Sequence, residues 1–181
     1  IIPLLFFQHC INVCLHAVDS NIGLFNYQRI RPLDAVIARV ILEGVIMIAT
    51  GLLVAGILAS LGFQIAIDAP LGFLMSVMFL GIFSLALGLF VSVLGGLSNE
   101  IQKIIPIIIR PMFFISGIFF TIASIPQPYQ TYLLLNPVLQ CVELLRSSMF
   151  SNYDTPVQNF SFILKSTLIA LFVGLIAYQP N

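Results

Sequence analysis

The chain has 181 residues, of which 60% are hydrophobic and 8% are charged, and its mean hydropathy is +1.10. A soluble domain carries roughly 25% charged residues, so this composition excludes an ordinary soluble protein. The formal net charge is zero, which leaves no broad basic face for nucleic acid.

Apolar runs of membrane length recur along the chain. A spanning helix needs about 20 predominantly apolar residues. On that basis the sequence predicts spans near 1–18 (a partial one), 40–61, 71–94, 104–123 and 160–178. We therefore predict an all-α integral membrane protein, a single domain over residues 1–181 with a bundle of about five transmembrane helices.

The two ends of the sequence predict a longer protein. Neither an initiator methionine nor a charged leader precedes Ile1. The last run ends at Asn181 without the lysine or arginine cluster that usually follows a membrane helix on the cytoplasmic side. We expect at least one helix to be missing upstream of Ile1, and the uncharged end suggests truncation at the C-terminus as well.

Basic residues in the short links predict the orientation in the membrane. Arg146 and Lys165 lie on one side. Five basic residues lie on the other: Arg29, Arg31, Arg39, Lys103 and Arg110. Because lysine and arginine are enriched in cytoplasmic loops, we expect the arginine-rich side to be cytoplasmic and segment 124–159 to lie outside.

The predicted outside segment is apolar, but prolines at 126, 128 and 137 interrupt it. Asn136 and Pro137 form a helix start, with asparagine as N-cap and proline at the first helical position. They predict a helix over 137–150, with Gln140, Glu143 and Ser147 on its polar face. We expect two short re-entrant or interfacial helices that line a pathway or its mouth. A simple interfacial anchor is the alternative.

The predicted cytoplasmic link can present polar side chains to a soluble partner. Pro32 opens a helix, and Asp34 lies in its first turn, where a carboxylate suits the helix dipole. Arg39 and Glu43 are four residues apart and can pair. The alternative is a solvated loop whose arginines only set the topology.

Small residues recur at four-residue spacing in two of the predicted spans. Such rows let helix backbones approach closely in lipid. We favour packing within one subunit over a dimer seam for both rows, which are Gly51, Ala55, Ala59 and Ser84, Gly88, Ser92.

Motifs for catalysis are absent from the sequence. A P-loop needs a lysine directly after glycine, whereas the two lysines follow Gln102 and Leu164. The carboxylates form neither an acid–base pair nor a mid-membrane relay. One candidate metal cluster comprises His9, Cys10, Cys14 and His16. A straight helix does not converge all four on a tetrahedral zinc ion, so we predict no catalytic residues, no metal site and no cofactor.

Three stretches resemble the permease subunits of capsular polysaccharide ABC exporters, which belong to the type 2 ABC transporter permeases. They are residues 24–34 (LFNYQRIRPLD, continuing to Glu43), 110–120 (RPMFFISGIFF) and 134–146 (LLNP, continuing to VELLR). Their order and spacing match the family. The family has six spans, so the resemblance covers the chain apart from an N-terminal tail and a first span.

The resemblance implies a multi-pass transport protein of the bacterial inner membrane rather than an enzyme. Two permeases would form the channel, and a separate ATPase subunit beneath each would bind ATP and magnesium. A lipid-linked polysaccharide would be extruded, with periplasmic and outer-membrane export proteins as further partners.

The resemblance also implies roles for particular residues. The coupling element and cytoplasmic gate would include Asn26, Tyr27, Arg29, Arg31, Asp34 and Arg39. The channel lining or outer gate would include Phe113, Phe119, Phe120, Tyr129, Tyr132, Glu143 and Arg146.

Three other functions remain open at this point. Another type 2 ABC permease, for O-antigen, teichoic acid or a drug, would have the same architecture. A membrane-embedded glycolipid enzyme would need a carboxylate or metal set at the membrane surface. An accessory scaffold would leave the proline-broken outer segment and the arginine-rich link unexplained.

Overall fold

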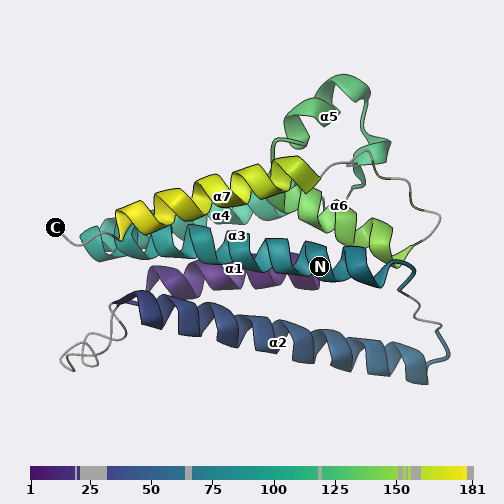
Figure 1. Ribbon diagram of the computed structural model, residues 1–181, viewed down its shortest axis with the longest axis horizontal. Helices are drawn as coiled ribbons and strands as arrows, with labels where there is room; N and C mark the ends of the chain where they lie inside the picture. Colours follow the sequence, from purple (N-terminus) through teal and green to yellow (C-terminus); the bar gives the residue numbers. More distant parts are fainter. Residues whose placement is uncertain are drawn as a thin grey trace.

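The computed structural model describes residues 1–18, 20, 32–63, 67–117, 120–150, 153, 155 and 160–178, and every regular element in these ranges is helical (Figure 1). The prediction of an all-α protein is confirmed for this part of the chain. The elements are α1 (Ile2–Leu15), α2 (Pro32–Ser60), α3 (Pro70–Leu97), α4 (Asn99–Ile115), the 3₁₀ turn η2 (Ile122–Ser124), α5 (Gln127–Leu133), α6 (Pro137–Met149) and α7 (Phe160–Ala177).

Among the described helices, α2, α3 and α7 have the length and apolar character of membrane spans, with 29, 28 and 18 residues. Proline at the first helical position fixes the start of α2 at Pro32 and of α3 at Pro70. The predicted span from residue 40 therefore begins eight residues after the start of the helix in the structure. The other two predicted spans correspond to shorter helices, α1 with 14 residues and α4 with 17.

Helix α3 is the centre of the bundle and packs against α1, α2, α4, α6 and α7. Glycines bring backbones into direct contact there. A Cβ atom at Gly95 would lie 2.4 Å from the carbonyl oxygen of Leu15 on α1. A Cβ at Gly174 of α7 would lie 2.6 Å from the carbonyl oxygen of Ala86. Only glycine permits these crossings, and close backbone approach is the usual basis of helix association in lipid.

The two rows of small residues differ in their surroundings. Ser84, Gly88 and Ser92 of α3 are all buried, as expected for packing within one subunit. A Cβ at Gly51 of α2, in contrast, would meet nothing within 4 Å, and Ala59 is exposed. The prediction of packing within the subunit is thus confirmed for the α3 row and wrong for the α2 row in the described structure.

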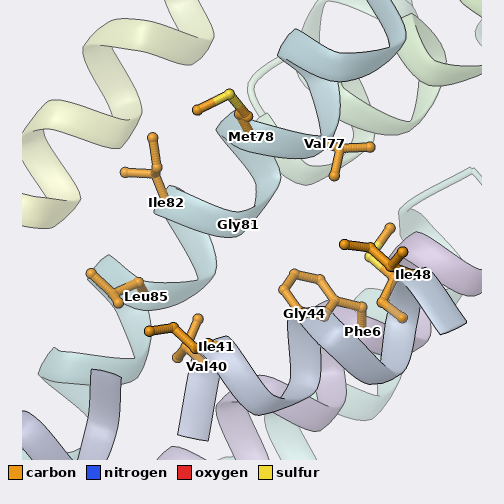
Figure 2. A pocket seen from close by; sticks show the side chains of 11 residues that line it. Phe6, Val40, Ile41, Gly44, Ile48, Val77, Met78, Gly81, Ile82 and Leu85 are labelled. Atoms are coloured by element: carbon orange, nitrogen blue, oxygen red, sulfur yellow. The ribbon is translucent and has the colours of Figure 1, made fainter. Parts of the chain in front are cut away.

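Helix α2 is attached to the bundle mainly through its N-terminal part. Its buried residues are Val36, Val40 and Glu43, and most apolar side chains beyond them are exposed. Figure 1 shows α2 diverging from α3 toward its C-terminal end. An apolar groove of about 300 Å³ separates the two helices, with Gly44 and Gly81 among its lining residues (Figure 2).

Candidate functional site

The start of α6 is joined to the end of α4 by one asparagine. Asn136 caps α6, since its side-chain oxygen accepts a hydrogen bond from the Val138 amide at 3.0 Å. Its side-chain nitrogen donates to Ser116 Oγ, directly after α4, at 3.3 Å. The predicted helix over 137–150 is confirmed as Pro137–Met149. Figure 1 shows α6 lying along the bundle, while α5 stands away from it.

Helix α6 is buried on both of its faces. Val138 and Cys141 of the apolar face are buried, and so are Gln140 and Glu143 of the polar face. The polar face predicted from the sequence is therefore covered by protein at these two residues. The physical reason is that Glu143 has protein partners, which replace the water that a carboxylate otherwise requires.

A charged network joins three segments around the fully buried Glu143. The Arg146 guanidinium donates through Nη1 to Glu143 Oε1 at 2.7 Å and through Nη2 to the Gly117 carbonyl oxygen at 2.8 Å. The Tyr153 hydroxyl donates to Glu143 Oε2. The guanidinium carbon also lies 5.7 Å from the centroid of the Tyr153 ring. We call Gly117, Glu143, Arg146 and Tyr153 the outer network.

Hydrogen-bond donors surround the buried carboxylate of the outer network. Both Glu143 oxygens have donors, which makes a buried carboxylate tolerable. Burial, and then the hydrogen bond to Glu143, raise the pKa of Tyr153 above its ordinary value. The phenol therefore stays protonated and remains a donor throughout the physiological pH range.

Gly117 explains why α4 ends earlier than predicted. Its φ is +81°, in the left-handed region that favours glycine. A Cβ there would also lie 2.5 Å from Leu139 Cδ1 on α6. The helix therefore ends at Ile115 and the chain turns at Gly117, so the predicted span over 104–123 was wrong in its second half. Its apolar residues from 120 onward precede the outer helices instead.

Those outer-gate candidates whose side chains the structure describes do not form one cluster. Glu143 and Arg146 meet in the outer network. Tyr129 and Tyr132 are exposed on α5, and Phe120 is half-buried after the α4 turn. Phe113 belongs to α4, and Phe119 lies outside the described residues.

Of the cytoplasmic candidates, the structure describes Asp34 and Arg39. Asp34 is exposed in the first turn of α2, as predicted, and Arg39 is half-buried one turn later. The candidates outside the described residues are Asn26, Tyr27, Arg29 and Arg31.

The predicted pairing of Glu43 with Arg39 was wrong. Glu43 Oε2 instead lies 3.0 Å from His9 Nδ1 on α1, because this side of α2 faces the neighbouring helix. His9 also belongs to the candidate metal cluster. Among the residues that the structure describes, no group of three or more His, Cys, Asp or Glu side chains is placed to hold a metal ion.

The fold and the outer network define a class of protein. Three membrane-length helices and a glycine-packed core make an integral membrane protein, and the outer network ties α6 to the turn after α4. The sequence model of the ABC-2 type transporter family matches residues 5–150. The chain therefore belongs to the ABC-2 type transporter family, as the resemblance predicted, and is a transport permease rather than an enzyme.

Particular relatives extend this assignment over the whole chain. The polysialic acid transport protein KpsM of Escherichia coli is 36% identical over 181 residues, which are 100% of this chain and 70% of that protein. The capsule polysaccharide export inner-membrane protein CtrC of Neisseria meningitidis is 25% identical over 95% of this chain and 65% of its own length. BexB of Haemophilus influenzae, with the same description, is 26% identical over 91% of this chain and 62% of its own length.

Proposed function

We propose that this chain is the membrane permease region of an ATP-driven exporter that moves capsular polysaccharide across the bacterial inner membrane. The observation that carries the proposal is the 36% identity to KpsM over all 181 residues. The relatives are named for polysialic acid transport and for capsule polysaccharide export at the inner membrane. A polysaccharide is the substrate class that we propose from these names.

In this proposal α1 and α4 complete a set of five crossing elements together with α2, α3 and α7. Helix α1 is apolar and packs against α3, α2 and α4. Helix α4 carries Pro106 and Pro111 and still continues to Ile115. The link between α1 and α2 faces the cytoplasm, and the segment with α5 and α6 faces outward.

The partners follow from the same proposal. Two copies of the permease form the channel, and a separate ATPase subunit supplies the bound ATP and magnesium. The link that contains Arg29 and Arg31 contacts this ATPase, and Asp34 and Arg39 continue the contact into α2. A lipid-linked polymer passes outward to periplasmic and outer-membrane export proteins. The aromatic residues around 113–132 and the outer network line the exit.

The test is co-purification of the full-length permease with the ATPase encoded beside it. We expect the two proteins to elute together in detergent and the permease to change the rate of ATP hydrolysis. The double substitution Arg29→Glu with Arg31→Glu should weaken the complex at least about tenfold, because it replaces two attractive charges by repulsive ones.

A matched control is Lys103→Glu, which changes the charge of an exposed residue on the same predicted side but outside the link. It should leave the complex intact. Absence of any complex with a folded wild-type permease would contradict the ABC exporter assignment. Undiminished binding by the double variant would remove the link from the ATPase contact.

A further inference from the structure

The point at which α2 leaves the bundle is marked by a carboxylate. Val36, Val40 and Glu43 are the buried residues of this helix. The next residue, Gly44, already lines the groove between α2 and α3 (Figure 2). From Val45 onward most large apolar side chains of α2 are exposed. Glu43 is therefore the last buried residue of α2, and Met47, one turn later, is only partly buried against the core.

Glu43 has a specific partner on the neighbouring helix. Its Oε2 lies 3.0 Å from His9 Nδ1, and the two side chains are 10% and 68% exposed. An ionised carboxylate within a membrane span is costly unless it is paired. The contact holds for either charge state of the imidazole, because Nδ1 donates a proton to the carboxylate in the imidazolium and in one neutral tautomer.

Few other groups compete for this carboxylate. Cys10 and Cys14 of α1 are buried thiols on the adjoining face. Arg39 lies one turn earlier on α2 and is half-buried, but the ion pair that the structure records for Glu43 is with His9. Helix α3, which packs against both helices, has no titratable side chain. His9 is thus the residue on which the position of Glu43 depends.

We propose that the Glu43–His9 pair is a positioning clasp that fixes the angle of α2 against α1. With the clasp formed, three successive turns of α2 are held at Val36, Val40 and Glu43. Without it, the fully buried contacts of α2 are reduced to the two valines, with Leu33 and Met47 partly buried beside them, and the long exposed part of the helix can pivot about this attachment. The inference rests on the proposed function in one respect: α1 and α2 flank the link that carries Arg29 and Arg31, so their angle would set how this link meets the ATPase.

The first experiment measures the angle without the ATPase. Spin labels on cysteines introduced at Leu53 of α2 and Leu74 of α3, both exposed, report the distance between the diverging parts of the two helices. The full-length permease in lipid nanodiscs is compared with Glu43→Gln, with His9→Gln and with the charge exchange His9→Glu plus Glu43→His. A permease without introduced cysteines corrects for native thiols, among which Cys10, Cys14 and Cys141 are buried.

We expect the distance distribution to broaden in both single variants and to narrow again in the exchange variant. The matched control Glu100→Gln, at an exposed glutamate of α4, should leave it unchanged. An unchanged distribution in Glu43→Gln would overturn the clasp. Broadening that the exchange does not reverse would also overturn it, because the two residues would then act separately.

The second experiment measures coupling in the complex. Permease-dependent ATP hydrolysis should fall about five- to tenfold in each single variant, with the ATPase still bound, and recover to within about twofold in the exchange variant. Unaltered hydrolysis together with a broadened distance would overturn the role of the clasp in coupling. Failure of the wild-type permease to bind any ATPase would instead count against the proposed function, while the distance measurement would still decide the clasp.

Discussion

At the scale of single residues, Arg146 has two tasks that no other described side chain shares. It neutralises the fully buried Glu143 and also donates to the carbonyl oxygen of Gly117, where α4 gives way to the outer segment. The planar guanidinium suits this double contact because its donors point along fixed, separate directions. A lysine could serve one acceptor as a point charge, but not both with the same geometry.

We therefore expect Arg146→Ala to lower the free energy of unfolding by about 3–5 kcal/mol, because it leaves a buried carboxylate without its counter-ion. Tyr153→Phe, which removes one donor but keeps the ring beside the guanidinium, should cost less, about 1–3 kcal/mol. Circular dichroism of the purified permease during chemical unfolding in detergent would measure both.

The matched control for Arg146 is Lys165→Ala, at an exposed basic residue of α7. It should change the free energy of unfolding by no more than about 0.5 kcal/mol. An Arg146→Ala permease as stable as the Lys165→Ala permease would show that water or another group compensates Glu143.

Sequence patterns reach some of these residues and miss others for physical reasons. Glu143 and Arg146 are three residues apart on the helix whose start is predicted by Asn136 and Pro137. Their contact therefore follows from helical spacing. Tyr153 lies beyond the helix end, where no period applies, and its contact with Glu143 depends on how the chain folds back. The predicted Arg39–Glu43 pair is not formed, because a spacing of four residues along α2 carries no information about the histidine that α1 places beside Glu43.

At the scale of elements, the glycines of the α3 crossings determine how close the helices come. Gly174→Leu should lower the unfolding free energy by at least about 1–3 kcal/mol, since its side chain would have to displace the backbone of α3 at Ala86. Gly51→Leu on α2 is the control, because a Cβ there meets nothing within 4 Å. Thermal unfolding followed by circular dichroism would compare the two, and equal melting temperatures would contradict the crossing.

Element ends were predictable wherever the signal is local. Pro32 and the Asn136–Pro137 pair were predicted to begin helices and do so in the structure, and α3 begins at Pro70, one residue before the predicted span. The end of α4 was not predictable from hydropathy, because apolar residues continue through the turn at Gly117. That turn exists because a glycine adopts a positive φ against Leu139, a contact between segments that no single window of sequence contains.

At the scale of the whole molecule, apolar composition identifies the membrane spans but does not show which face of each helix contacts protein and which contacts lipid. In their most apolar windows, 11% of the residues of α2 are buried against 39% of those of α3. Both helices look alike in sequence because lipid and protein interior are similarly apolar, so burial in a membrane leaves little compositional trace. Only the three-dimensional arrangement distinguishes the central helix from the peripheral one.

This difference predicts a labelling pattern in the membrane. A diazirine reagent dissolved in the bilayer should modify α2 strongly around Leu52 and Leu53, which are exposed, and α3 weakly around Leu89 and Val91, which are buried. Mass spectrometry of peptides from the full-length permease in nanodiscs would give the ratio, which we expect to exceed about tenfold. The reason is that an insertion reagent modifies only side chains that it can touch.

If α2 were labelled as weakly as α3, α2 would not lie at the periphery of the bundle. Additional protein would then cover Leu52 and Leu53. Repeating the experiment with Glu43→Gln distinguishes a helix that is covered by additional protein from a helix that pivots when the clasp is lost. A helix that only pivots keeps its lipid-facing residues labelled, while Phe6, which is buried at the groove, gains label. A helix already covered by protein would change neither, so the pattern reports both where α2 lies and how firmly its first turns are held.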